Sequence, residues 1–240
     1  SVTLPNSTET TQARVRVEAV GNIYFDVSDT NFTITQAGNT PPTLNVIGSV
    51  STRQGSPATA AVVATIGDAQ DSAGSLLVSV EGAPPELLVS AANSAGSVGL
   101  TAMATCSLVA PGGSKTYPVL LRVTDSAGAQ ITGAANVLVS RNLVPTLGSY
   151  ANASVERGAA INVAPAVAPA DGNNNLAAPT ILPTTLPGGG TVSIAANGAT
   201  TVSTTTGTAL GVHTLRAFAN DTCGATDVQQ FTVTVTPPVT

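Results

Sequence analysis

The chain has 240 residues, of which 42% are hydrophobic, 3% aromatic and 9% charged, and its net charge is −5. At about 100–150 residues per domain, this length accommodates about two domains. Its one lysine, Lys115, and its scattered arginines exclude the clustered positive charge that nucleic acid or an anionic membrane surface requires. No run approaches the ~18 consecutive apolar residues of a membrane span, so no membrane insertion is expected.

The chain is poor in charge, since soluble domains usually carry about 25% charged residues. Its surface must therefore be covered by threonine, serine, asparagine and glycine. Because tryptophan is absent, its cores must be built from valine, leucine, isoleucine and alanine. This composition fits an exported β-rich protein better than a cytosolic enzyme.

The first segment, residues 1–38, contains a predicted hairpin. Residues 13–21 alternate between apolar and polar side chains, the chain turns at Gly21, and residues 23–34 continue the pattern. An isolated hairpin is marginal in water. We therefore expect this segment to pack on a neighbour, or to self-associate through its open edge.

The second segment, residues 42–140, is cut into short strand-like runs by turn signals. We expect seven strands, near residues 44–50, 58–66, 75–81, 86–91, 97–106, 116–124 and 129–139. A proline-containing linker, residues 39–43, precedes them.

The third segment, residues 144–237, follows a second linker at residues 142–146. It is predicted to contain strands near residues 147–155, 159–167, 178–184, 190–196, 199–206, 212–220 and 226–236, with fainter alternation. Helical periodicity is missing from both segments.

The second and third segments are copies of one unit. Residues 117–128 and 213–224 are both alternating strands that close on Asp-x-x-Gly, offset by 96 residues, and Gly55 and Gly158 end a second matched pair. A period near 96 residues with seven short strands is typical of a repeated β-sandwich. The predicted fold class is all-β, with tandem immunoglobulin-like β-sandwiches. Residues 1–38 match the last two strands of a unit and are interpreted as the C-terminal hairpin of a truncated immunoglobulin-like domain.

Residues 67–76, Gly-Asp-Ala-Gln-Asp-Ser-Ala-Gly-Ser-Leu, precede the strand that runs from Tyr117 to the Asp-x-x-Gly turn. Together they resemble the immunoglobulin-like and cadherin-like repeats of bacterial surface proteins. The resemblance covers roughly residues 42–237 and implies a secreted or wall-associated location. It implies no particular ligand.

Residues 13–34, Ala-Arg-Val-Arg-Val-Glu-Ala-Val-Gly-Asn-Ile-Tyr-Phe-Asp-Val-Ser-Asp-Thr-Asn-Phe-Thr-Ile, carry a second resemblance. They are similar to the accessory domain that follows the catalytic unit in bacterial reprolysin-like zinc metalloproteases. That resemblance implies a place downstream of a protease. The motif His-Glu-x-x-His is absent here, so no catalytic residue carries over.

The one histidine, His213, does not predict a catalytic site. A general base needs an orienting partner and a cleft, and a histidine-rich zinc site needs more than one imidazole. The repeat places His213 at the position of Tyr117, near the start of the penultimate strand. A tyrosine there anchors a corner of immunoglobulin-like sandwiches, so both residues are interpreted as structural corner residues.

Other candidate sites are interpreted as structural as well. Residues 171–175, Asp-Gly-Asn-Asn-Asn, offer oxygen ligands, but Leu176 and Leu182 stand where a calcium loop needs glycine and glutamate. An inter-strand turn is favoured, with a shared interdomain calcium site as the alternative. No Gly-x-Ser-x-Gly elbow is present, and the run Pro-Gly-Gly-Gly190 precedes a strand rather than a phosphate-binding helix. We expect no cofactor, metal or catalytic residue.

The two cysteines, Cys106 and Cys223, are predicted to lie near each other. Cys106 is expected to end the fifth strand of one unit, and Cys223 falls in the turn between strands six and seven of the next. In a seven-strand sandwich these two places face the same junction between domains. Exported proteins are oxidised, so a bridge between them across that junction is one hypothesis. The alternative is a buried thiol at 106 and an exposed thiol at 223.

The sequence predicts a non-catalytic structural spacer or interaction module of a secreted or cell-surface bacterial protein. One alternative is the accessory C-terminal region of a secreted zinc metalloprotease. Another is an adhesin module that binds an unidentified protein or carbohydrate, although three tyrosines and four phenylalanines leave little for sugar stacking.

Overall fold

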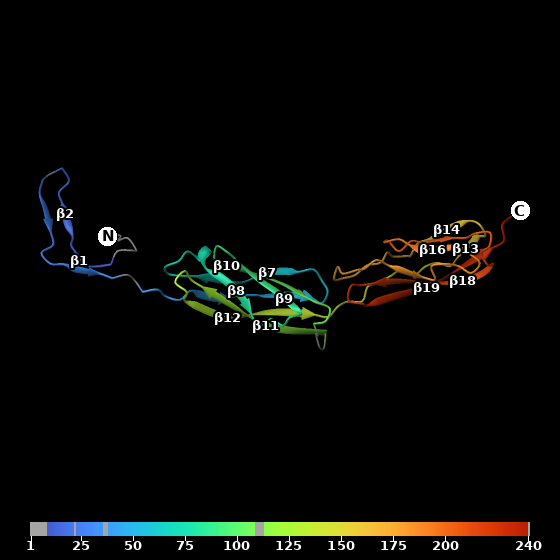
Figure 1. Ribbon diagram of the computed structural model, residues 1–240, viewed down its shortest axis with the longest axis horizontal. Helices are drawn as coiled ribbons and strands as arrows, with labels where there is room; N and C mark the ends of the chain where they lie inside the picture. Colours follow the sequence, from blue (N-terminus) through green and yellow to red (C-terminus); the bar gives the residue numbers. More distant parts are fainter. Residues whose placement is uncertain (1–8, 22, 36–37, 109–112, 240) are drawn as a thin grey trace.

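The computed structural model describes residues 9–21, 23–35, 38–108 and 113–239. Figure 1 shows three parts arranged end to end: an N-terminal hairpin, a first β-sandwich and a second one. We call the sandwiches sandwich 1 (residues 43–140) and sandwich 2 (residues 146–236). The fold class predicted from the sequence, all-β with tandem immunoglobulin-like sandwiches, is confirmed.

Sandwich 1 consists of two four-stranded sheets packed face to face. One sheet has the order β5-β7-β10-β9, and the other has the order β6-β12-β11-β8. The strands are β5 (Thr43–Val46), β6 (Ser49–Arg53), β7 (Thr59–Gly67), β8 (Leu77–Glu81), β9 (Leu87–Ser94), β10 (Ser97–Ala104), β11 (Ser114–Thr124) and β12 (Gln130–Ser140). A single turn of 3-10 helix, Ala73–Ser75, lies before β8.

The first predicted strand, residues 44–50, is divided between the two sheets, so sandwich 1 has eight described strands rather than seven. β5 pairs with β7 in antiparallel register, whereas β6 pairs with β12 in parallel register. At the crossing, the N–H groups of Ile47 and Gly48 both donate to the carbonyl of Val63, at 2.8 and 3.1 Å. A Cβ at Gly48 would lie 2.8 Å from the carbonyl oxygen of Val62. Glycine therefore permits the chain to pass this close to β7.

The core of sandwich 1 follows from the alternation of side chains along its strands. In β10 every second residue is buried, and the same period recurs at the ends of β11 and β12. The inward side chains are small aliphatics from both sheets, among them Val63, Val98, Leu100, Val119, Leu121, Val123, Val137 and Val139. They form one hydrophobic core without an aromatic centre.

Sandwich 2 repeats the arrangement with shorter strands. Its sheets have the orders β13-β19-β18-β15 and β14-β17-β16. The strands are β13 (Ala153–Glu156), β14 (Ala160–Val163), β15 (Thr180–Leu182), β16 (Thr191–Ile194), β17 (Thr200–Ser203), β18 (Gly211–Asn220) and β19 (Thr226–Thr236). Its opening strand is also interrupted: Thr146 bridges to Ala170 before β13 pairs with β19 in parallel register.

An aromatic pair distinguishes the core of sandwich 2. The rings of Tyr150 and Phe231 are stacked, with centroids 4.5 Å apart. The Tyr150 hydroxyl donates to the carbonyl of Gly198 at 2.6 Å. Burial raises the pKa of Tyr150 above its usual value.

The N-terminal part is a hairpin of two paired segments. β1 (Thr10–Ala13) pairs with β4 (Phe32–Ile34), and β2 (Arg16–Glu18) pairs with β3 (Phe25–Val27). Figure 1 shows it standing away from sandwich 1. Its apolar side chains are exposed: Val17 to 67%, Tyr24 to 72% and Phe25 to 61%. The described residues of the hairpin therefore do not pack on sandwich 1, and its association with another molecule through the open edge stays a prediction.

Among the described residues, no helix is long and apolar enough to cross a membrane.

Candidate functional site: the junction between the sandwiches

A disulfide bond joins the two sandwiches. Cys106 lies in the loop that follows β10, beyond the strand's last residue, and not within the strand as the sequence predicted. Cys223 lies in the turn between β18 and β19. Their sulfurs are bonded at 2.01 Å, and their Cα atoms are 5.2 Å apart. Cys106 is exposed and Cys223 is half-buried, which differs from the alternative of a buried thiol at 106.

Gly55 makes room for this bond. It follows β6 with φ of +72°, a conformation that glycine adopts without strain. A Cβ there would overlap the sulfur of Cys223, and it would lie 3.2 Å from the sulfur of Cys106. Any larger residue at this position would have to displace the bridge.

Asn142, in the linker, is the centre of a hydrogen-bond network across the junction. Its side-chain amide donates to Asp221 Oδ2 at 2.5 Å. Its side-chain carbonyl accepts from Asn173 Nδ2 at 2.8 Å and from Asn175 Nδ2 at 3.0 Å. Its backbone N–H donates to Gln54 Oε1 of sandwich 1 at 2.9 Å. One linker residue therefore contacts both sandwiches.

The network is buried. Asn173, Asn175 and Asp221 are only 4%, 6% and 5% exposed. Asn173 Nδ2 also reaches the backbone carbonyl of Gln54 at 3.2 Å, and Asn175 Nδ2 lies 3.5 Å from the sulfur of Cys223. A buried polar network is costly when any member is left unpaired. These contacts therefore favour one fixed orientation of the sandwiches.

The loop 171–175 belongs to this network. The Asp171 carboxylate accepts from the backbone N–H of Asn173 at 2.7 Å, which forms the turn. Asp221 Oδ1 accepts from the N–H groups of Cys223 and Ala225, at 2.9 and 2.8 Å. Within the described part of the chain, no group of three or more histidine, cysteine, aspartate or glutamate side chains is placed to hold a metal.

The linker before sandwich 1 has a related contact. Asn39 Nδ2 donates to Asp125 Oδ2 at 2.8 Å, as Asn142 does to Asp221 in the next unit. This hydrogen bond lowers the pKa of Asp125, and backbone N–H donors in the same turn add to the effect. Gln70, in the loop equivalent to 171–175, accepts from the Thr40 hydroxyl at 2.8 Å. An asparagine that binds the Asp-x-x-Gly turn is thus a repeated feature of both linkers.

Tyr117 and His213 hold the same place in their sandwiches, in β11 and β18. Tyr117 pairs with Val137 on the neighbouring strand, and His213 pairs with Val233. The two pairs are therefore equivalent positions in the two units. His213 Nε2 lies 2.9 Å from the carbonyl of Ala209, four residues upstream. Lys115 Nζ lies 4.7 Å from the centre of the Tyr117 ring. These contacts are local to each sandwich and lie apart from the junction network.

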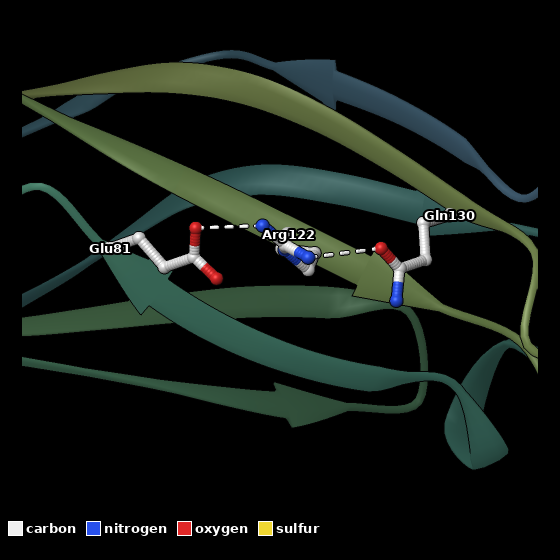
Figure 2. Close-up of polar contacts among 3 residues, drawn as sticks. All are labelled: Glu81, Arg122 and Gln130. Carbon is white, nitrogen blue, oxygen red and sulfur yellow. Dashed lines mark hydrogen bonds and ion pairs between the residues drawn. The ribbon is translucent and has the colours of Figure 1, made fainter.

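A charged contact lies on the outer face of sandwich 1. Arg122 pairs with Glu81 at 2.8 Å and donates to Gln130 at 3.0 Å, so it connects β8, β11 and β12 (Figure 2). Both charged side chains are more than one-third exposed. Exposed ion pairs contribute at most ~1 kcal/mol, so this surface contact adds little to the stability of sandwich 1.

Sequence reasoning located the cysteines but missed the amide network. No sequence pattern indicated a role for Gln54 or Asn142. Asn173 and Asn175 appeared only as part of the loop 171–175, which was considered as a possible calcium site. One sequence signal could have indicated this network. Asparagine begins both linkers, and an aspartate stands at the same place in both Asp-x-x-Gly turns.

Comparisons with known proteins identify no family. No family model and no curated protein matches the chain. Among solved structures, titin domains Z1Z2, in complex with telethonin, are 16% identical and cover 85% of this chain and 100% of their own, with a TM-score of 0.40. An adhesin region of Streptococcus sanguinis SK1, described as sialic acid binding, is 13% identical over 84% of this chain and 79% of its own, with a TM-score of 0.31.

An endo-fucoidan hydrolase of glycoside hydrolase family 107 is also similar. It is 14% identical, with a TM-score of 0.40, and this chain spans 38% of its length. TM-scores this low carry no argument about what the present chain binds or catalyses.

Proposed function

We propose that this chain is a non-catalytic spacer, in which two sandwiches are held end to end as one stiff rod within a secreted or cell-surface protein. The observation that supports it most directly is the junction, where a disulfide and a buried amide network fix the two units together. A spacer needs a defined length and orientation. Flexible linkers between independent domains provide neither.

The same bond supports an oxidising location. Disulfides persist outside the reducing cytosol, so an exported rod can keep the Cys106–Cys223 bridge. The low charge and the threonine-rich surface are consistent with export. We also propose a bacterial origin and a place downstream of a zinc metalloprotease. Both rest on the sequence resemblances alone.

Small-angle scattering tests the rod. We expect the oxidised chain to give an elongated particle whose maximum dimension matches two sandwiches in line plus the hairpin. Intact mass under non-reducing conditions should be lower by two hydrogen atoms than after reduction, because the bridge forms with loss of both thiol hydrogens. A compact particle, or two thiols that alkylate freely in the native protein, would contradict the proposal.

A second candidate function is binding through the hairpin, with a second copy of the chain as the partner. It is favoured by the exposed aromatic side chains there, since Tyr24, Phe25 and Phe32 are 72%, 61% and 41% exposed. We expect sedimentation to show concentration-dependent dimers, and Tyr24→Ser with Phe25→Ser to weaken them at least tenfold. A chain that stays monomeric at all concentrations would rule this function out.

A further inference from the structure

The position of the disulfide in the chain determines which segments can be stretched. Cys106 and Cys223 are 117 residues apart in sequence, so their bond closes a large covalent loop. The loop contains β11, β12, the linker and β13 to β18. β5 to β10 precede the loop, and β19 follows it.

We propose that the Cys106–Cys223 bridge makes this chain a load-bearing rod, in which tension passes around sandwich 2 along β19 and leaves that sandwich folded. This inference rests on the proposed spacer role, because a spacer held at both ends experiences tension. Force applied to the two ends enters through β5, leaves sandwich 1 at Cys106, crosses the sulfur–sulfur bond and continues from Cys223 through β19. The linker runs in parallel with the bridge and cannot be extended past it.

Sandwich 2 gains almost no length by unfolding under this load. The force acts on it only between Cys223 and Thr236, the last residue of β19. Most of this short stretch is β19 itself, which has 11 residues and already forms an extended strand. A strand rises about 3.3 Å per residue, close to the limit for a stretched chain. Force promotes unfolding only in proportion to the length gained, so tension does not favour unfolding of sandwich 2.

Sandwich 1 is protected only in part. The stretch from Thr43 to Cys106 bears the load, and it folds back and forth through β5 to β10. Pulled straight, it would span about 200 Å at ~3.3–3.6 Å per residue. Tension can therefore open β5 to β10, whereas β11 and β12 lie inside the closed loop. Sandwich 1 is the part that yields.

Without the bridge, the two sandwiches would behave alike. Each would be pulled between its first and last strands, over residues 43–140 and 146–236. Each would then release about 300 Å of chain on unfolding, at the same length per residue. The bridge therefore replaces two equal extensions with one shorter extension.

Single-molecule pulling of the full chain by its two ends tests this. From the length of a stretched chain, we expect the oxidised protein to show one sandwich event of about 200 Å and no event of about 300 Å. The double variant Cys106→Ser, Cys223→Ser should show two events of about 300 Å each. Its fully stretched length should exceed that of the oxidised chain by about 400 Å, because the chain between the two cysteines, which are 117 residues apart, can then be extended.

The matched control is the double variant Ser107→Ala, Thr222→Ala, which changes the residues beside the cysteines and keeps the bridge. It should reproduce the oxidised pattern. If the cysteine variant does not fold, the wild-type chain pulled in the presence of a dithiol reductant supplies the same comparison, since the dithiol is oxidised as the bridge becomes two thiols.

Two results would overturn the inference: two full-sized events in the oxidised wild-type chain, or equal stretched lengths with and without the bridge. Neither result would reject the proposed spacer if scattering still shows an elongated particle. A compact particle in scattering would instead reject the spacer role, whatever the pulling curves show.

Discussion

Gly55 and Gly158 hold matching places in the two sandwiches, but their surroundings differ. Both have positive φ, +72° and +90°. A Cβ at Gly158 would meet nothing within 4 Å, whereas one at Gly55 would overlap the junction disulfide. The pair therefore separates the effect of backbone strain from the effect of crowding at the junction.

Gly158→Ala should cost about 1 kcal/mol of unfolding free energy, which is the strain of a positive φ. Gly55→Ala should cost a further ~1–3 kcal/mol, because the bridge and Asn175 must shift to admit the methyl group. Urea unfolding of the oxidised proteins measures both. Equal losses in the two variants would show that the close packing around Gly55 does not constrain the junction.

Asn142→Ala should destabilise the oxidised chain by about 1–3 kcal/mol, because it removes the side-chain donor to Asp221 Oδ2 and the acceptor shared by the buried amides of Asn173 and Asn175. Asn39→Ala, in the first linker, removes one contact to Asp125 and should disturb only that end of sandwich 1. Hydrogen exchange distinguishes them. The backbone N–H of Leu143 donates to Asn173 Oδ1 at 3.3 Å. The Asn142 variant should loosen Asn173 and expose this amide, whereas the Asn39 variant should leave it protected.

The acid stability of sandwich 1 should depend on Asp125. Its pKa in the folded state is lowered, so the stabilisation is complete above the unfolded value near 3.9 and is lost as the pH falls through the folded value. Unfolding followed from pH 6 to pH 2 should therefore show sandwich 1 weakening below about pH 4. Asn39→Ala should flatten that dependence. An unchanged profile would mean that the hydrogen bond from Asn39 does not hold the carboxylate.

At the level of single residues, the sequence placed both cysteines at the junction and left their bridge as one of two alternatives, and it did not indicate the amides around them. The cysteines could be paired because the connectivity of a sandwich assigns each loop to one end of the domain. The amide network could not be predicted, because Asn142 and Asn173 are 31 residues apart and carry no pattern that distinguishes them from ordinary turn asparagines.

The strands of both sandwiches were predictable where apolar and polar side chains alternate. They were less predictable where backbone geometry determines where a strand begins, ends or changes sheets. β10, β11 and β12 alternate cleanly and were located to within about two residues at each end. The opening strand was predicted as one piece because residues 44–50 read as continuous. It changes sheets at Gly48, where the close approach to Val62 is a tertiary contact that a local pattern does not contain.

Tyr150 tests the core of sandwich 2. Tyr150→Phe should keep the stacking on Phe231 but leave the carbonyl of Gly198 without its donor, at a cost of about 1–2 kcal/mol. Because burial raises the pKa of Tyr150, the wild-type core is stabilised below the unfolded pKa near 10 and loses that contribution as the pH rises through the folded value.

Denaturant unfolding at pH 8 and pH 11 checks both statements. The wild-type protein should lose more stability than Tyr150→Phe between these two pH values. If both proteins lose the same amount, Tyr150 is not the group that couples this core to alkaline pH.

On the scale of the whole molecule, the junction distinguishes this chain from two independent sandwiches joined by a flexible linker. The short, proline-containing linkers alone allow an extended arrangement with limited bending. The bridge adds a covalent constraint that spans 117 residues and couples the two cores. Removing it should leave each sandwich folded, because each has its own hydrophobic core.

The distribution of tyrosine offers a practical consequence. The chain has no tryptophan and three tyrosines, and Tyr24, Tyr117 and Tyr150 lie one each in the hairpin, sandwich 1 and sandwich 2. Ultraviolet emission from the protein is therefore the sum of three signals, each from a different part. Replacing two tyrosines with phenylalanine, a far weaker emitter, would leave a single tyrosine as the dominant fluorophore, so the unfolding of each part can be followed optically without an attached dye.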